Sequence, residues 1–231
     1  MTEYLVRFAN QVPSFNADWN DPVWQQAQAA VVEHFRPESS PHRPRTQVRL
    51  LHDTASLQGI FQVEDRFVRC VRTRFMDEVW KDSCVEVFIQ PKAGQGYFNF
   101  EFNCGGAFLC CHITDPTRVP GGFKAFVPVP EASAAVRVAT TLPPVTEPEQ
   151  AGPLTWALQF VIPFQLLEKY TGPIALDTPW RGNFFKCSEE NSHPHWASWS
   201  PVDEFNFHLP RCFGTFRFEV PIGPDSPSGR A

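Results

Sequence analysis

The chain has 231 residues, of which 42% are hydrophobic and 19% are charged, and it contains 22 Phe and 7 Trp. This composition supplies ample material for a packed core and excludes disorder for most of the chain. The net charge is -5 and the basic residues are scattered, so the sequence lacks the electrostatic footprint of a protein that binds nucleic acid. No stretch approaches the roughly 20 apolar residues that span a bilayer, which argues against a membrane partner.

The N-terminal residues and the cysteines indicate the cellular location of the protein. The N-terminal sequence MTEYLVRFANQVP lacks the basic segment followed by an apolar segment that marks a secretory signal. The seven cysteines are an odd number and form no CxxC pair, which favours reduced thiols over a disulfide framework. We therefore expect a cytoplasmic protein, or an extracellular or periplasmic one if the N-terminus is incomplete.

Apolar runs with a period of two, bounded by turn residues, recur along the chain and predict short strands. A first helix is expected to begin at Asp21 and Pro22, because Asp caps a first turn and Pro suits its first position. A second helix is expected from Pro163 to Tyr170, ended by Gly172. The expected strands span residues 46–52, 56–64, 67–73, 83–90, 97–103, 107–114, 135–142, 154–162, 181–188 and 213–220.

About ten short strands without long crossover helices predict an all-β fold, an antiparallel β-sandwich with one or two short helices. Two Pro-rich polar segments, residues 36–45 and 143–153, are expected to be loops. No internal repeat or linker divides the chain. Residues 1–220 are therefore expected to form a single domain, and residues 221–231 a flexible tail.

The strand expected at residues 97–103 has one polar face. Phe occupies every second position there and alternates with Tyr97, Asn99, Glu101 and Asn103. Amide, carboxylate and phenol groups hydrogen-bond neutral hydroxyls, so this face is either a binding surface or an ordinary solvent-exposed face. Glu86, in the otherwise apolar preceding strand, would lie beside it if the two strands pair as a hairpin. Its carboxylate is satisfied either by an Arg or backbone amide or by a ligand.

Three stretches together resemble the carbohydrate-binding modules of family 9, part of the wider DOMON-like group of jelly-roll-type β-sandwiches. They are DWNDPVWQQA at residues 18–27, MDEVWKDSCVEVFIQP followed by YFNFEFN at residues 76–103, and the segment 180–218 with a Phe-Gly pair before its last strand. The resemblance implies a non-catalytic domain in which two aromatic rings clamp a terminal sugar of the glucose or xylose type, as found in glucans and xylans.

The resemblance also implies which residues hold the sugar. Trp80 matches the first aromatic position, and Glu86, six residues later, matches a carboxylate that accepts sugar hydroxyls. The second aromatic falls within HWASWSPVDEFNFH, where we expect Trp199, with Trp196 and Phe207 as alternatives. An aromatic ring covers the C–H bonds on a pyranose face, while polar groups meet the hydroxyls at its rim. The polar residues expected to set selectivity are Glu86, Glu101, Asn103, Asn183 and Lys186.

Two other functions remain open from the sequence. A scaffold or interaction domain could keep this fold without binding sugar. A glycoside hydrolase acting on xylan-type or glucan-type polysaccharide needs two carboxylates about 5 to 10 Å apart, a spacing that Glu86 and Glu101 on paired strands could meet.

Metal sites have weaker support in the sequence, and no cofactor is implied with certainty. His193 and His195 share one strand face and could bind a metal with His208 or Cys187 as a third ligand. Members of family 9 can also hold structural calcium, although no cluster of Asp and carbonyl ligands assigns such a site here.

Overall fold

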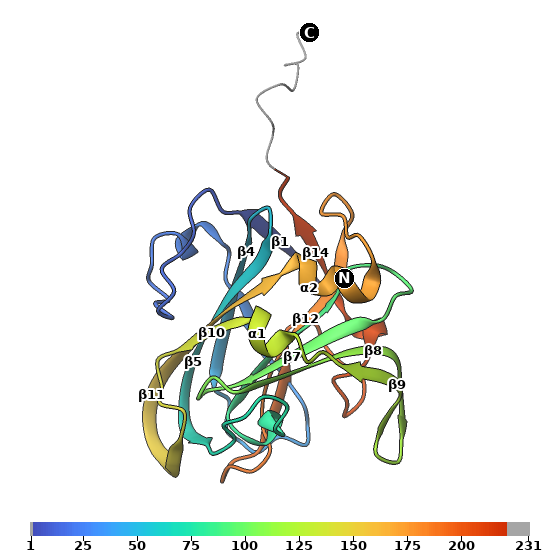
Figure 1. Ribbon diagram of the computed structural model, residues 1–231. Helices are drawn as coiled ribbons and strands as arrows, with labels where there is room; N and C mark the ends of the chain where they lie inside the picture. Colours follow the sequence, from blue (N-terminus) through green and yellow to red (C-terminus); the bar gives the residue numbers. More distant parts are fainter. Residues whose placement is uncertain (1, 221–231) are drawn as a thin grey trace.

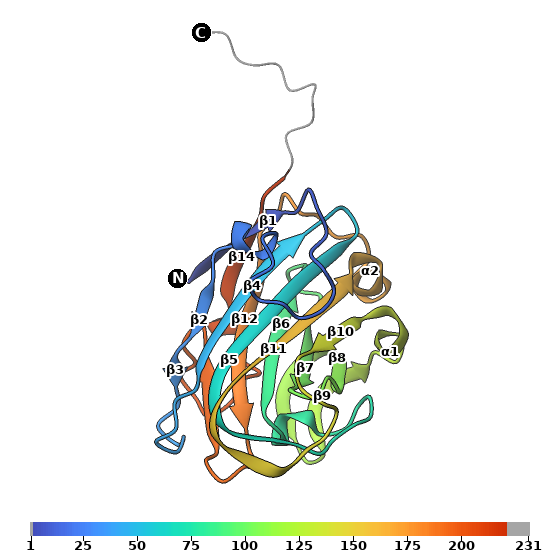
Figure 2. The same ribbon diagram turned by 90° about the vertical axis from the view of Figure 1, so that its left-hand side faces the viewer.

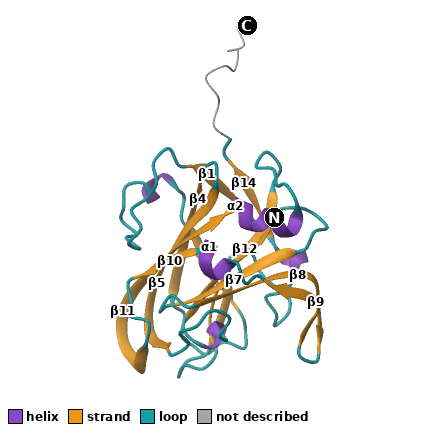
Figure 3. Cartoon of the chain, in the orientation of Figure 1, coloured by secondary structure: helices purple, strands orange, loops and turns teal. Residues whose placement is uncertain are grey.

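The computed structural model describes residues 2–220, so the expected tail at residues 221–231 lies outside the described part of the chain. Strands are the predominant regular structure, and the helices are short (Figure 3). The strands are β1 (Glu3–Phe8), β2 (Ala30–Val32), β3 (His34–Phe35), β4 (Arg45–His52), β5 (Ser56–Cys70), β6 (Cys84–Gln90), β7 (Tyr97–Asn103), β8 (Phe108–Val119), β9 (Gly122–Pro128), β10 (Arg137–Thr140), β11 (Thr146–Pro163), β12 (Trp180–Ser188), β13 (His195–Ser198) and β14 (Gly214–Phe218). The helices are α1 (Ala132–Ala135) and α2 (Phe164–Thr171), with 3-10 turns η1 (Trp24–Gln26), η2 (Val79–Lys81) and η3 (Pro210–Cys212).

The strands form two layers that are joined along one side (Figures 1 and 2). The strand order is β10-β11-β5-β4-β1-β14-β12-β6-β7-β8-β9. Strand β1 joins the layers, because its first four residues pair with β14 and its last two residues pair with β4. These two pairings are parallel, and the other strand pairs in residues 2–220 are antiparallel. The predicted all-β sandwich is confirmed.

A large apolar core fills the space between the two layers. The phenylalanines of β7, Phe98, Phe100 and Phe102, point into it and are fully buried. Phe102 stacks on Phe160 of the facing layer with ring centroids 5.3 Å apart. Buried aromatic pairs of this kind stabilise by about 0.5–1.5 kcal/mol beyond the area they bury. The inner face of the sandwich therefore follows the period of two seen in the sequence.

The two expected helices have different outcomes. The first is only the 3-10 turn η1, preceded by Asp21, whose carboxylate accepts hydrogen bonds from the main-chain N–H groups of Ser14 and Val23. The second is confirmed as α2, and it ends at Gly172, whose φ of 68° favours glycine. Within residues 2–220, we find no helix with the length and apolar character needed to span a membrane.

Several strand boundaries differ from the prediction. Strand β5 runs without a break where two strands were expected, and strands β1, β2, β3, β9 and β13 were not predicted. The prediction of a loop at residues 143–153 is wrong, because β11 already begins at Thr146. Two register shifts opposite β5 accommodate the extra residues, as bulges do. Since β10 pairs only with residues 158–161, this part of β11 is an edge, where prolines are tolerated.

Gly182 of β12 lies in close contact with β14. A Cβ atom at this position would lie 2.3 Å from Cε2 of Phe216 and 2.5 Å from the main-chain oxygen of Phe88. We therefore expect Gly182→Ala to lower the free energy of unfolding by about 1–3 kcal/mol through overpacking, and to lower Tm by several degrees. The control is Gly152→Ala, where nothing lies within 4 Å of the added Cβ. Thermal melts that give both variants the same Tm would contradict the packing described.

Candidate functional site

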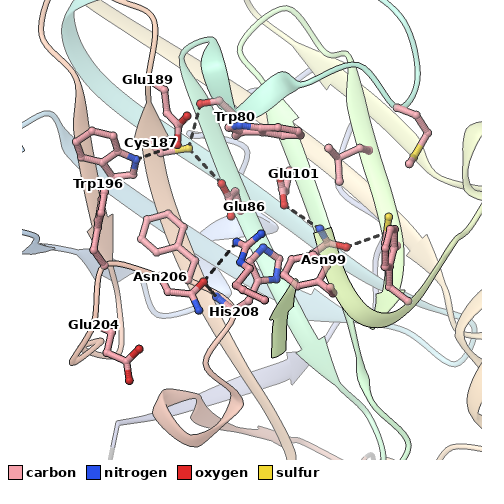
Figure 4. A pocket seen from close by; sticks show the side chains of 18 residues that line it. Trp80, Glu86, Asn99, Glu101, Cys187, Glu189, Trp196, Glu204, Asn206 and His208 are labelled. Atoms are coloured by element: carbon pink, nitrogen blue, oxygen red, sulfur yellow. Dashed lines mark hydrogen bonds between the residues drawn. The ribbon is translucent and has the colours of Figure 1, made fainter. Parts of the chain in front are cut away.

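A pocket of about 730 Å³ lies on the face of the β12-β6-β7-β8 layer that points away from the core. Alternate residues of these strands form its floor. Its walls come from η2, from the β8–β9 hairpin and from residues 204–208, which precede η3 (Figure 4). The floor is therefore built on paired strands and the walls on turns and loops.

Two carboxyl groups lie side by side in the floor. Glu86 of β6 is directly opposite Glu101 of β7, so the expected hairpin is confirmed. Both side chains are almost fully buried. The Asn99 amide donates to Oε1 of Glu101 at 2.8 Å and accepts from the main-chain N–H of Cys111 at 2.9 Å. The middle of the polar face of β7, Asn99 and Glu101, is thus part of the floor of a pocket and not an open, solvent-exposed surface.

Burial keeps the two carboxyl groups of the floor from being fully ionised near neutral pH. Burial raises the pKa of Glu101 to about 7, although the hydrogen bond from Asn99 and the charge of Arg118 act in the opposite direction. Burial, followed by the charge of Glu101, raises the pKa of Glu86 well above its usual range. Protonated carboxyl groups both donate and accept hydrogen bonds, so this floor suits a neutral, hydroxyl-bearing ligand.

Two tryptophans line the pocket. Trp80 belongs to η2, and Trp196 belongs to β13, which pairs with β12 beside Cys187. Figure 4 shows the two indoles on either side of Glu86 and Cys187. The Trp196 indole N–H donates to Glu189 at 3.2 Å, which holds this ring in place. Both rings are only half-buried, so their remaining surface is open to the pocket.

Trp199, the expected second aromatic, does not line the pocket. Its ring is buried in the core between the layers, with centroids 5.3 Å from Phe184 and 5.7 Å from Phe216. Trp199 follows Trp196 by three residues, so strand alternation places its side chain on the opposite face, the face on which Ala197 also joins the core. Both alternatives, Trp196 and Phe207, do line the pocket, and Phe207 stacks on Phe185 with centroids 4.1 Å apart.

Two of the expected polar ligands hold loops in place and lie outside the pocket lining. The Asn103 amide donates to the main-chain oxygen of Arg72 and to Asp82, each within 2.9 Å. The Asn183 side chain donates to the Ser200 main-chain oxygen and accepts from the Ser200 N–H. Both side chains are fully buried, and their hydrogen bonds go to main chain and to neighbouring side chains. The structure therefore corrects their expected contact with a ligand.

Lys186 also lies outside the pocket, because it points to the inner side of β12. Its ammonium donates to the Cys187 main-chain oxygen at 3.0 Å and lies 2.8 Å from Nε2 of His195 and 3.7 Å from Asp65. Adjacent residues of a strand face opposite sides, and Cys187 lines the pocket. The same contacts occupy His195, and Nδ1 of His208 lies 2.8 Å from the Tyr97 hydroxyl, so the expected histidine metal site does not assemble.

Part of the pocket wall was not predicted from the sequence. The guanidinium of Arg118, in β8, lies 4.2 Å from the Phe123 ring centroid and 3.5 Å from the Asn206 side-chain oxygen. Phe126 of β9 lies further along the same wall. These residues were not predicted as part of a site, because the β8–β9 hairpin is largely exposed and lacks the apolar period of a strand. Asn206 stands within the C-terminal stretch that the resemblance indicated.

Five chains of solved structures match this chain, and three of them are described below. A Bacteroides uniformis protein assigned to carbohydrate binding is 25% identical, with a TM-score of 0.81 over 94% of this chain and 99% of that one. A family 9 carbohydrate-binding module from Caldicellulosiruptor kristjanssonii, in complex with glucose, is 12% identical, with a TM-score of 0.65 over 98% of this chain and 100% of that one. Such a module from this organism in complex with cellotriose is 12% identical, with a TM-score of 0.62 over 96% of this chain and 100% of that one. No curated protein matches the sequence.

The sequence also matches a family model, that of carbohydrate-binding family 9, over residues 22–218. This match corrects the expected location, because domains of this family are typically extracellular, and the cytoplasmic expectation is wrong. All seven cysteines are free, as expected for reduced thiols, but six of them are buried and do not report on the surroundings of the protein. The chain belongs to carbohydrate-binding family 9, whose domains bind carbohydrate without catalysis.

Proposed function

We propose that the pocket binds the terminal sugar of a glucose- or xylose-type carbohydrate, with Trp80 covering one face of the ring and Trp196 acting as the second aromatic. The observation that carries this proposal is the presence of both half-exposed indoles around one open pocket with carboxyl and amide groups in its floor. The glucose and cellotriose complexes of the Caldicellulosiruptor modules, which share this fold, support a glucan-type ligand.

The polar groups of the pocket suit the rim of a sugar. Glu86, Asn99 and Glu101 offer donors and acceptors from the floor, while Arg118 and Asn206 offer them from the wall. A buried polar group that loses its hydroxyl partner costs about 1–3 kcal/mol, which gives selectivity between sugars that differ at one hydroxyl. The volume of about 730 Å³ lies within the range of roughly 300–1,000 Å³ found for small-molecule sites.

Membership in carbohydrate-binding family 9 argues against a hydrolase, because the domains of this family bind carbohydrate without catalysis. The two carboxyl groups of the floor, Glu86 and Glu101, are placed to act as hydrogen-bond partners of a bound sugar. The open pocket in turn argues against a purely structural scaffold, in which both indoles would be packed inside.

Trp80→Ala is expected to weaken binding of glucose or cellobiose about 10- to 100-fold, since an aromatic face contributes about 1.5–3 kcal/mol when it is covered. Isothermal titration calorimetry against glucose, cellobiose, xylose and xylobiose measures the effect. Trp19→Ala is the control, because this ring packs under Arg49 on the other layer and lies outside the pocket. Unchanged affinity in Trp80→Ala, or no heat with any sugar in the wild type, would contradict the proposal.

Trp196→Ala and Phe207→Ala decide which ring is the second aromatic. We expect the larger loss of affinity, again about 10-fold or more, in Trp196→Ala, because one face of Phe207 is already stacked on Phe185. The same calorimetric titrations give the comparison. A loss of affinity confined to Phe207→Ala would show that Phe207, and not Trp196, is the second aromatic.

The raised pKa of Glu101 predicts a dependence of stability on pH. The group changes from its usual 4.5 to about 7 on folding, so the folded protein holds this proton more tightly than the unfolded chain. Its contribution to stability is therefore fully present below about pH 4.5 and is lost as the pH rises through about 7. We expect the wild type to lose at most about 3 kcal/mol of unfolding free energy through this group between pH 4.5 and 8.

Denaturant unfolding of Glu101→Gln at several pH values tests this dependence. The variant is expected to show a smaller fall with rising pH than the wild type, because it carries no proton to lose. Glu64→Gln, at an exposed carboxyl group on the other layer, serves as the control and should follow the wild type. Identical pH profiles for Glu101→Gln and the wild type would show that Glu101 does not titrate as described.

A further inference from the structure

Two thiols and one carboxyl group converge in the floor of the pocket and directly beneath it. Cys84 of β6 and Cys187 of β12 are directly opposite each other in the paired strands. Glu86 follows Cys84 by two residues, so its side chain leaves β6 on the same face. The three donor atoms lie within 4.8 Å of one another. Within residues 2–220, this is the one group of three His, Cys, Asp or Glu donors that comes so close together.

We propose that Cys84, Cys187 and Glu86 form a binding site for a thiophilic divalent metal ion such as Zn²⁺. Zinc takes thiolate ligands at about 2.3 Å and carboxylate ligands at about 2.0–2.2 Å in a tetrahedral arrangement, which places its donor atoms roughly 3.5–3.8 Å apart. Sγ of Cys187 lies 3.1 Å from Oε1 of Glu86, so small side-chain rotations open the space for an ion. Three protein ligands leave the fourth position for water from the pocket.

The donor set selects the metal. Thiolates favour zinc and other thiophilic ions, whereas calcium and magnesium take oxygen ligands almost exclusively. The site is therefore distinct from the structural calcium that the family resemblance implies. A disulfide between Cys84 and Cys187 would use both thiols but would leave Glu86 without its hydrogen-bond partner at 3.1 Å. The convergence of the carboxylate on both sulfurs favours a metal.

Because the ligand groups are buried, the affinity of this site for a metal ion depends on pH. Cys84 and Cys187 are at most 1% exposed, and burial raises the pKa of Cys84 to about 12 and that of Cys187 well above its usual range. An ion must therefore displace the protons of both thiols and of the Glu86 carboxyl group, so its affinity should rise steeply with pH. The charge of buried Lys186 favours both thiolates and partly offsets the negative charge of two thiolates and one carboxylate.

The pocket gives an ion access to this site. Glu86 and Cys187 both line the pocket, and Figure 4 shows them together at its floor below Trp80. The main-chain oxygen of Trp80 lies 3.5 Å from Sγ of Cys187, so the turn that carries this indole also contacts the site. A bound ion would therefore sit directly beneath the space proposed for the sugar.

Titration of the reduced full-length chain with Co²⁺ tests the proposal, because cobalt bound by thiolates gives a charge-transfer absorption band. We expect this band to saturate at one ion per chain and to disappear when Zn²⁺ is added. In Cys84→Ala/Cys187→Ala the band should be lost and Zn²⁺ binding should weaken at least about 100-fold, while Glu86→Gln should keep the band and bind at least about 10-fold more weakly. Cys70→Ala/Cys104→Ala removes a second pair of buried thiols without a converging carboxylate and should behave as the wild type.

Circular dichroism establishes that each variant is folded before it is compared. If the Cys84→Ala/Cys187→Ala variant does not fold, the wild-type titration and Glu86→Gln decide the question. No charge-transfer band in the reduced wild type, or an unchanged band in Cys84→Ala/Cys187→Ala, would overturn the proposal. A Cys84–Cys187 disulfide that forms in air despite saturating Zn²⁺ would also overturn it, because ligated thiolates are protected from oxidation.

Discussion

The alternation of side chains along β7 couples the core of this protein to its pocket. Phe98, Phe100 and Phe102 fill the space between the layers, and the intervening Asn99 and Glu101 form the pocket floor. A slip of one residue would move a carboxylate into the core and an aromatic ring into the pocket. The packing of the core therefore fixes the register of β7 against β6 and of β6 against β12, and these registers fix the positions of the floor groups.

Burying two carboxyl groups side by side in the floor lowers the free energy of unfolding when they are ionised. The raised pKa values of Glu86 and Glu101 have the same cause. Each group is nevertheless oriented by a neighbour: Glu101 accepts from Asn99, and Glu86 accepts from Cys187. These hydrogen bonds each use the Oε1 atom, so the second oxygen of each carboxyl group can meet a ligand in the pocket. Groups that are already oriented lose little further freedom when a sugar binds, which favours affinity.

The fold class and half of the pocket could be predicted from the sequence, because both depend on local patterns. The alternation of apolar residues along the strands predicts the sandwich. Trp80 and Glu86 are separated only by the end of a turn and the start of the next strand, so their relative positions depend on a short stretch of backbone. The second aromatic and the wall around Arg118 could not be predicted in this way. Trp196 and Trp199 are three residues apart, so strand alternation places them on opposite faces, but it does not say which face is the pocket. That choice is set by the pairing of β13 with β12 and β3, which are distant in the sequence.

The amides that were expected to touch the ligand show how one polar strand face serves two purposes. At the middle of β7 the polar side chains face the pocket, whereas at its end Asn103 binds Asp82, directly after the turn that carries Trp80. Asn183 holds Ser200 in the same manner, at the start of the segment that supplies the opposite wall. The floor is rigid because it consists of paired strands, but the walls are loops whose positions depend on these buried amides. The shape offered to a sugar is therefore decided as much by residues that hold the loops as by residues that line the pocket.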